Sequence, residues 1–334
     1  MNENIKLLQA KISSFKMDDR PEDKYKKYSY SGLSTLKQCP YQFNLTYNEG
    51  KRSNDTTLAL QLGTLLHYVL EQKGYMIKEG VVDYKKLSDI LQNGTTETDE
   101  KTKEAIIGLK QLKKIYWETW GIPDSEGRTY DQKIETFLKV LSDEMQRDDW
   151  QPYLFEHPFK FVYDNKIILH GFIDRVDTKT VGDEVIFRVV DYKTNKKPYP
   201  DKDLATSLQF GIYALAILNE FGTIPEEYQY RLILLDQEQY ALTKGWEKRL
   251  LTALDKLVKE LDDRTASGEW IPKPTPLCHW CNFCATNAEA KEYKNECPYY
   301  SLWTPENKTY EVKNEYNNIF KINAVDKTKR SMIF

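Results

Sequence analysis

Two aspartates and a lysine have the types and spacing needed to bind a metal ion and act on a phosphate ester. Asp191 and Lys193 are one residue apart in VVDYKTN, at the end of a run of strand-forming residues. Alternate residues of a strand face the same way, so both side chains should point to one face of a sheet. Asp174 ends an earlier strand-like segment, GFID. Carboxylate oxygens suit Mg²⁺ or Mn²⁺, and such an ion can lower the pKa of bound water from ~16 towards ~7.

An isolated acid-x-lysine pair is usually a solvated ion pair, so the chemical interpretation depends on further residues. His67 or Glu71, four residues apart on a predicted helix, could complete a metal site. Gln209 and Tyr213 share one face of a later helix. From there the amide could reach a phosphate or a base, and the ring could stack on a base.

The elements that position these side chains follow from changes in hydrophobic periodicity. A first helix is predicted over residues 29–47, with Ser31 as N-cap, Cys39 inside it and Pro40 as its end or kink. Helices then follow at 58–78, 84–120 and 131–148. Three strands with short polar links form a predicted antiparallel meander, followed by a helix, a fourth strand and a last helix. These six elements are 159–163, 166–177, 184–192, 203–222, 227–236 and 244–267. The order predicts an α/β core with a mixed sheet.

The ordered set of motifs resembles the PD-(D/E)xK nuclease superfamily, in its RecB-like branch, over roughly residues 30–300. The matching motifs are G-x-x-x-H, G-x-x-D, D-x-K and Q-x-x-x-Y; they end, respectively, at His67, Asp174, Lys193 and Tyr213. The resemblance implies a restriction-endonuclease-like α/β fold with a central mixed sheet flanked by helices. It also implies a metal held by His67, Asp174, Asp191 and the backbone carbonyl of Tyr192, with Lys193 acting on the attacking water.

Five cysteines suggest a second metal site. Four lie within twenty residues, as Cys278, Cys281, Cys284 and Cys297, and Cys39 lies far upstream. Clustered cysteines in an intracellular setting favour metal over disulfides, although buried free thiols are an alternative. A local four-cysteine zinc site is possible, but a zinc ribbon prefers two C-x2-C pairs and the chain has one.

The same layout resembles AddB-type and CRISPR-adaptation-type nucleases, in which one cysteine before the nuclease core and three after it hold a [4Fe–4S] cluster. That resemblance assigns Cys39, Cys278, Cys281 and Cys297 as ligands, with Cys284 as the alternative fourth ligand. Such a cluster would join the two ends of the core.

The motifs divide the chain into three predicted parts. Residues 1–28 are polar and are expected to form a flexible lead-in, and residues 29–300 form the nuclease domain. That domain contains a helical insertion at 84–148 and the cysteine segment at 278–297. Residues 301–334 form a polar C-terminal tail without a clear pattern.

Charge and hydropathy limit the partners. The 334 residues carry a formal net charge of −3, so contact with nucleic acid requires a local basic surface, such as Lys196 and Lys197 beside the D-x-K strand. Tyr192 and Tyr199 could stack on unpaired bases. No run reaches the roughly 20 apolar residues of a membrane span, and no signal peptide is recognisable, which predicts a cytoplasmic protein, in the host cytoplasm if viral. No phosphate-binding P-loop is present, so a helicase would be a separate partner.

These observations favour a metal-dependent DNA exonuclease acting on ends or single strands in recombination, repair or DNA degradation. An endonuclease or flap-trimming activity is one alternative. A DNA-binding accessory or inhibitor protein that keeps the fold without cleaving is another.

Overall fold

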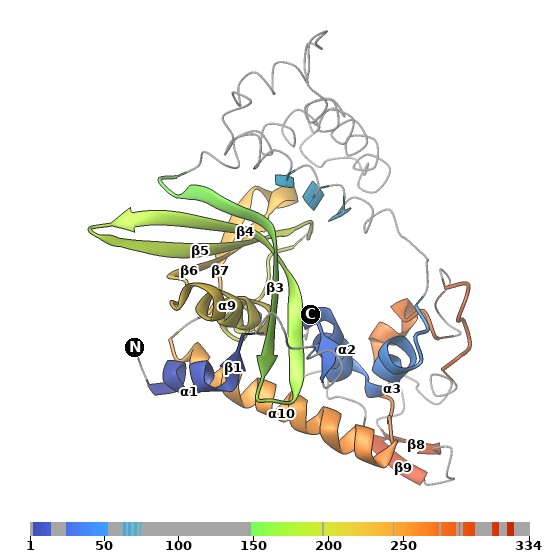
Figure 1. Cartoon of the computed structure of the whole chain (residues 1–334). Helices are drawn as coiled ribbons and strands as arrows, with labels where there is room; N and C mark the ends of the chain where they lie inside the picture. Colours follow the sequence, from blue (N-terminus) through green and yellow to red (C-terminus); the bar gives the residue numbers. More distant parts are fainter. Residues whose placement is uncertain are drawn as a thin grey trace, which may run out of the picture.

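The computed structural model of the chain has a seven-stranded mixed sheet at its centre (Figure 1). It describes residues 3–14, 25–52, 63, 64, 66, 67, 70, 71, 74, 148–195, 197–242, 244–273, 275–284, 287, 290–297, 309–313 and 319–323. The strand order is β1-β3-β4-β5-β6-β7, and β2 pairs with β4 beside this path. The α/β fold with a mixed sheet is therefore confirmed.

The predicted meander forms the middle of the sheet. Strands β3 (Gln151–Tyr163), β4 (Ile167–Val181) and β5 (Glu184–Lys193) pair antiparallel in sequence order. Both hairpin turns use left-handed backbone, at Asp164 and Asn165 (φ 53° and 51°) and at Gly182 (φ 63°), which matches the twist of the paired strands. The polar links in the sequence thus fix the register of the strands that carry the acids.

A helical crossover then makes the next strand pairing parallel. Strand β6 (Glu227–Leu232) runs parallel to β5, and β7 (Gln237–Tyr240) returns antiparallel to β6. The crossover contains two helices, α8 (Asp201–Ala205) and α9 (Leu208–Phe221), where the sequence predicted one. The break occurs because the Ser207 side chain caps α9, accepting a hydrogen bond from the backbone of Phe210.

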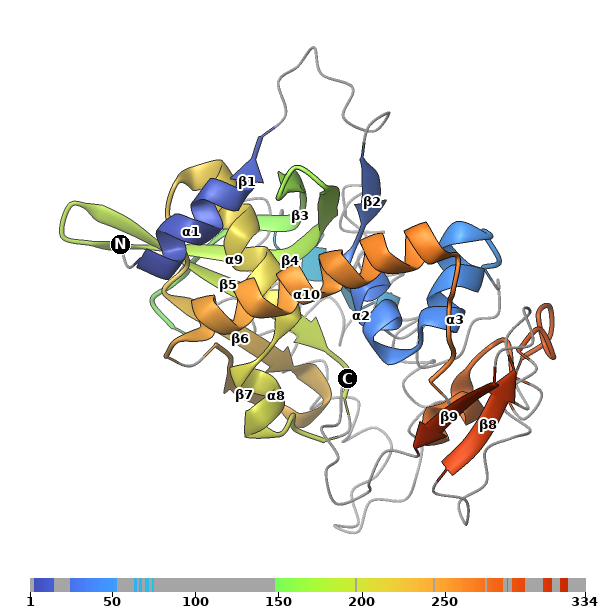
Figure 2. The same ribbon diagram turned by 90° about the horizontal axis from the view of Figure 1, so that it is seen from below.

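Three helices cover one face of the sheet, as Figure 2 shows: α1 (Glu3–Lys11), α9 and α10 (Trp246–Ser267). Helix α9 is buried from Gln209 to Leu218, because it packs against both the sheet and the other two helices. Its residues lie in the main hydrophobic core. This burial fixes the position of the Gln209 and Tyr213 side chains relative to β5.

Within residues 1–28, for which the polar composition predicted a flexible lead-in, the described segments 3–14 and 25–28 form a helix and two short strands. Helix α1 buries Ile5 and Leu8 in the core, and Lys11 lies 2.7 Å from Asp255 of α10. Short strands β1 (Ile12–Ser13) and β2 (Lys26–Tyr28) pair with β3 and β4. Two buried side chains are enough to order α1, because they enter an existing core.

The predicted helix over 29–47 is divided in three: α2 (Tyr30–Gln38), α3 (Pro40–Phe43) and a π-helical turn (Asn44–Asn48). Ser29, not Ser31, is the N-cap of α2. Cys39 does not lie inside a helix, because its extended backbone separates α2 from Pro40 at the start of α3.

The C-terminal tail contains a feature that the sequence did not predict. Strands β8 (Thr309–Lys313) and β9 (Ile319–Asn323) form an antiparallel pair. The predicted helices at 84–120 and 131–148 lie outside the described residues, apart from Asp148. Within the part of the chain that the structure describes, no helix is long and apolar enough to cross a membrane.

Candidate active site and thiol cluster

The two aspartates lie side by side at one end of the β4–β5 pairing. The last paired residues there are Arg175 and Val190, and Asp174 and Asp191 occupy the next position on each strand. Both are buried, with 8% and 1% of their surfaces exposed. The backbone N–H of Tyr192 donates to Asp174 Oδ2 at 2.7 Å. Strand register therefore brings together two carboxylates that are seventeen positions apart in the sequence.

Asp191 contacts three side chains that differ in kind. Its Oδ1 accepts hydrogen bonds from Gln209 Nε2 at 2.7 Å and from the Tyr213 hydroxyl at 3.4 Å. Its Oδ2 lies 2.5 Å from Lys193 Nζ as an ion pair. The carboxylate of Asp191 is thus held from both sides, by two neutral donors at one oxygen and by an ammonium group at the other.

Gln209 and Tyr213 are placed differently from the expectation that they meet DNA directly. The Gln209 amide also donates to the Tyr213 hydroxyl at 2.9 Å, and the two side chains are 9% and 5% exposed. Tyr192, also expected to stack on bases, is 2% exposed and packs edge-on against His67. All three side chains support the site from within the core.

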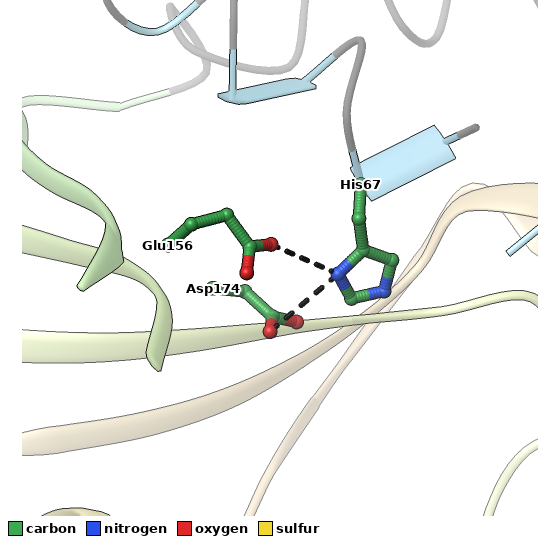
Figure 3. Close-up of side chains that lie close together, drawn as sticks. All are labelled: His67, Glu156 and Asp174. Carbon is green, nitrogen blue, oxygen red and sulfur yellow. Dashed lines mark hydrogen bonds and ion pairs between the residues drawn. The ribbon is translucent and has the colours of Figure 1, made fainter. Parts of the chain in front are cut away.

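A histidine and a glutamate converge on the first aspartate, Asp174 (Figure 3). His67 Nδ1 lies 3.2 Å from Glu156 Oε1 and 3.5 Å from Asp174 Oδ1. Among the described residues, these three side chains form the one group of metal-ligating residues whose donor atoms all lie within 4.8 Å of each other. Glu71 stands apart from the group, and its pKa is raised by burial and by the Glu156 carboxylate.

Sequence reasoning missed Glu156. The sequence predicts a strand only from residue 159, because Pro152 and Pro158 argue against a strand before it. In the structure β3 starts at Gln151, and Phe155 and His157 pair with the two residues that flank Asp174. Extending the predicted hairpin backwards from its turn places residue 156 opposite residue 174, and this register was the signal that could have found it.

The charges at the site are strongly coupled. Burial raises the pKa of Asp191 to about 6, and Asp174 adds to this while Lys193 and His67 oppose it. Burial disfavours the charged form of His67, but Asp174, Glu156 and Asp191 outweigh it and raise the pKa of His67 to about 10. For Lys193, burial is likewise outweighed by Asp191 and Asp174, which raise its pKa above the usual value. The acids hold protonated bases around them, as expected where excess negative charge is concentrated.

All five cysteines line one cavity, which lies between α3 and the 3₁₀ turn at Pro276–Trp280. The backbone N–H groups of Lys273 and Thr275 donate to Cys39 Sγ and Cys278 Sγ, at 3.5 and 3.4 Å. The Cys297 N–H donates to the carbonyl of Phe283. The fold thus brings Cys39 beside the C-terminal cysteines, as the family resemblance implied.

Cys284 occupies the middle of the thiol cluster. It is 1% exposed, and hydrogen bonds with Cys278, Cys281 and Cys297 raise its pKa. The bond to Cys284 lowers the pKa of Cys278 to about 7, against the effect of burial. Among the described residues, no three thiols lie mutually within 4.8 Å, so the sulfurs surround Cys284 without forming a tight set of four. A donor set made only of thiols suits zinc or an iron–sulfur cluster.

Comparison with known proteins gives one family and several relatives. The family model for the PD-(D/E)XK nuclease superfamily matches residues 27–286. A protein from Clostridium perfringens, named as a subunit of an ATP-dependent helicase/deoxyribonuclease, is 25% identical over 243 residues, covering 66% of this chain and 20% of its own length. The protein of the same name from Clostridioides difficile is 26% identical over 281 residues, covering 72% and 23%. The chain thus spans about a fifth to a quarter of the length of these relatives.

Proposed function

The chain belongs to the PD-(D/E)XK nuclease superfamily, in its RecB-like branch, and from this premise we propose that it hydrolyses phosphodiester bonds in DNA with a divalent metal ion. The observation that carries the proposal is the pairing of Asp174 with Asp191 at the end of β4 and β5, with Lys193 on the second acid. A structural role alone does not require two buried carboxylates at adjacent positions.

The residues present fit a hard divalent cation. Asp174, Asp191 and the Tyr192 carbonyl would hold it, together with His67 and Glu156. The oxygen-rich donor set, with the donor atoms of His67, Glu156 and Asp174 within 4.8 Å of one another, supports this assignment. When bound, Mg²⁺ or Mn²⁺ supplies a water of lowered pKa and a charge that stabilises the phosphate oxygens.

The remaining groups position and balance the acids. Lys193 lies beside Asp191, where its ammonium group can orient the attacking water or offset charge that develops on the phosphate. Gln209 and Tyr213 hold Asp191 in one orientation through its Oδ1, which leaves Oδ2 to pair with Lys193. Their role is thus to position a ligand rather than to touch DNA.

We propose an exonuclease that works from DNA ends, in recombination, repair or degradation, beside a separate helicase. The names of the relatives, which combine helicase and deoxyribonuclease, support a DNA substrate and a helicase partner. An endonuclease or flap-trimming enzyme is the second candidate, since the same acid pair serves either mode. A protein that binds DNA without cutting it would leave the buried acids unexplained.

End-labelled DNA tests this function. Linear single- and double-stranded DNA and closed circular DNA are incubated with the chain in Mg²⁺, Mn²⁺ or chelator. We expect nucleotides to be released from linear DNA only, and only with metal. Cleavage of closed circles would favour the endonuclease, and binding without cleavage in either metal would contradict the proposal.

We further propose a structural [4Fe–4S] cluster held by Cys39, Cys278, Cys281 and Cys297. The shared cavity supports one metal centre that uses thiols from both sides of the nuclease core, as the resemblance implies for a cluster. The cluster would join the end of α2 to the segment after α10. Anaerobically purified protein should contain about four irons per chain, as a cubane cluster requires. Cys284→Ala should keep this iron and Cys297→Ala should lose it; the reverse result would make Cys284 the fourth ligand, and stoichiometric zinc would refute the cluster.

A further inference from the structure

A basic groove of about 830 Å³ lies between α2, α8 and α10. Two acidic side chains line it, Asp203 and Glu260, against six basic ones: Lys37, Lys202, Lys248, Arg249, Lys256 and Lys273. The whole chain carries a net charge of −3. The groove is therefore a local concentration of positive charge on an acidic protein, which sequence composition required for any contact with nucleic acid.

One end of the groove reaches the candidate active site. Tyr30, Tyr199 and Tyr230 line this end, and the last two rings lie 4.7 Å apart. Lys193 Nζ lies 5.6 Å from the centre of the Tyr230 ring. Tyr30 and Tyr199 are half-buried, so part of each ring faces the groove. A tyrosine that lines the groove, Tyr230, thus lies beside the lysine that contacts Asp191.

The region around α10 gathers three lysines from separate segments. Lys37 lies in the last turn of α2, Lys256 lies on α10, and Lys273 follows α10. Lys273 Nζ donates to the Lys37 carbonyl at 3.3 Å and lies 3.7 Å from Glu260. Glu260 also pairs with Arg264, at 2.8 Å, so its charge is shared. Burial lowers the pKa of Lys37, and the charges of Lys256 and Lys273 lower it further. An anion placed among these lysines would relieve their repulsion.

We propose that this groove binds a single DNA strand, with phosphates at Lys37, Lys256 and Lys273 and unpaired bases against Tyr30 and Tyr199. The inference rests on the proposed function and adds the path of the strand to it. A positive groove lined with accessible aromatic rings is the usual arrangement for single strands, because stacking needs bases that are not paired. The strand would run from the lysines to the scissile phosphate beside Lys193.

Salt-dependent binding tests this path. A labelled oligothymidylate is titrated with the whole chain in chelator, which separates binding from cleavage. Each lost phosphate contact reduces the slope of log K against log salt by about 0.7 for a single strand, so Lys37→Ala/Lys256→Ala should reduce it by about 1.4 and weaken binding about 25-fold in 0.1 M salt. Lys6→Ala/Lys166→Ala is the matched control, because it removes two exposed lysines that do not line the groove.

Further variants separate charge from folding. Lys37→Arg/Lys256→Arg should keep the slope of the unchanged protein, and Tyr30→Ala should weaken single-strand binding without altering the slope. An unchanged slope in Lys37→Ala/Lys256→Ala would overturn the inference, as would equal losses for a duplex of the same length. Cleavage with a groove that does not bind DNA would refute only this inference, and groove binding without cleavage would refute only the nuclease function.

Discussion

Asp174 and Asp177 lie three residues apart on β4, and both are buried, but their partners differ in number and in kind. Asp177 is fully buried, and its carboxylate accepts two hydrogen bonds from each of two arginines. Nε and Nη2 of Arg175 donate at 2.6 and 2.8 Å, and Nε and Nη2 of Arg188 donate at 2.9 and 2.7 Å. Asp174 has no arginine among its described contacts, which are a backbone N–H and the His67 ring. The negative charge of Asp177 is thus balanced by two guanidinium groups, whereas the described contacts of Asp174 balance its charge only in part.

The two arginines that contact Asp177 also belong to a larger network of hydrogen bonds and ring contacts. Arg188 also binds Asp148 and stacks on Trp150, with its guanidinium carbon 4.9 Å from the ring centre. Arg175 donates to the Tyr192 hydroxyl at 3.0 Å. Tyr192 is the residue whose backbone N–H holds Asp174. The satisfied network therefore fixes the register that brings the two acids of the candidate site together.

The contrast between Asp177 and Asp174 indicates how to distinguish structural from functional acids that are equally buried: by the contacts that balance their charge. A buried charge must be compensated, since an isolated one costs several kcal/mol. At Asp177 the compensation is present in the chain. At Asp174 and Asp191 the described residues compensate only in part, which leaves room for a bound cation.

The largest effect is expected from removing Asp177. Asp177→Asn should destabilise the fold by about 3–5 kcal/mol, because it leaves two buried guanidiniums without their shared partner. Urea unfolding measures this as a lower midpoint. Asp191→Asn is the contrasting variant and should lose less stability, because it leaves one partly exposed lysine, Lys193, without its partner rather than two buried guanidiniums. Equal losses in the two variants would erase the distinction.

The next effect is on activity rather than stability. Lys193→Met should lower the cleavage rate about 10²–10³-fold, as removal of one charge-stabilising donor does elsewhere. Its urea midpoint should stay close to that of the unchanged protein. Initial rates on end-labelled DNA in Mn²⁺ measure the change, and Lys6→Met, at an exposed lysine of α1, is the control. Full activity in Lys193→Met would remove this lysine from the site.

A smaller effect is expected at Glu156. Glu156→Gln should weaken Mn²⁺ binding about tenfold, or about 1.4 kcal/mol, because it removes one carboxylate of a shared site. Titration calorimetry measures it. Glu220→Gln is the matched control, because Glu220 also pairs with a histidine, His157, at 2.7 Å but outside the site. Identical affinities in the two variants would make the His67–Glu156 contact structural.

The sequence alone was enough for the parts of the site that depend on local pattern. Strand periodicity and the order of short motifs placed Asp174, Asp191 and Lys193 on neighbouring strands, and the structure brings them together. The convergence of Cys39 with the C-terminal cysteines followed from a family resemblance rather than from any local rule. The helix that carries Gln209 was also predictable, though not the inward direction of its amide.

Long-range pairings were beyond the reach of the sequence. Glu156 joins the site through strand register across a segment with two prolines, and Asp148 meets Arg188 over forty positions. Helix α1 is polar overall, and only its docking on α10 through Lys11 and two buried side chains makes it part of the core. These elements are decided by tertiary partners, which no short window of sequence contains.

The central claim is that Asp174 and Asp191 share a divalent cation while Asp177 does not. Thermal unfolding with and without Mn²⁺ tests it directly, because a ligand at 100 times its Kd stabilises the native state by about 2.7 kcal/mol. Asp164→Asn removes an acid from the β3–β4 turn at the other end of the hairpin and serves as control. We expect Mn²⁺ to raise the Tm of the unchanged protein and of Asp164→Asn by a few degrees, and to have no effect on Asp191→Asn. An equal rise in Asp191→Asn would contradict the account.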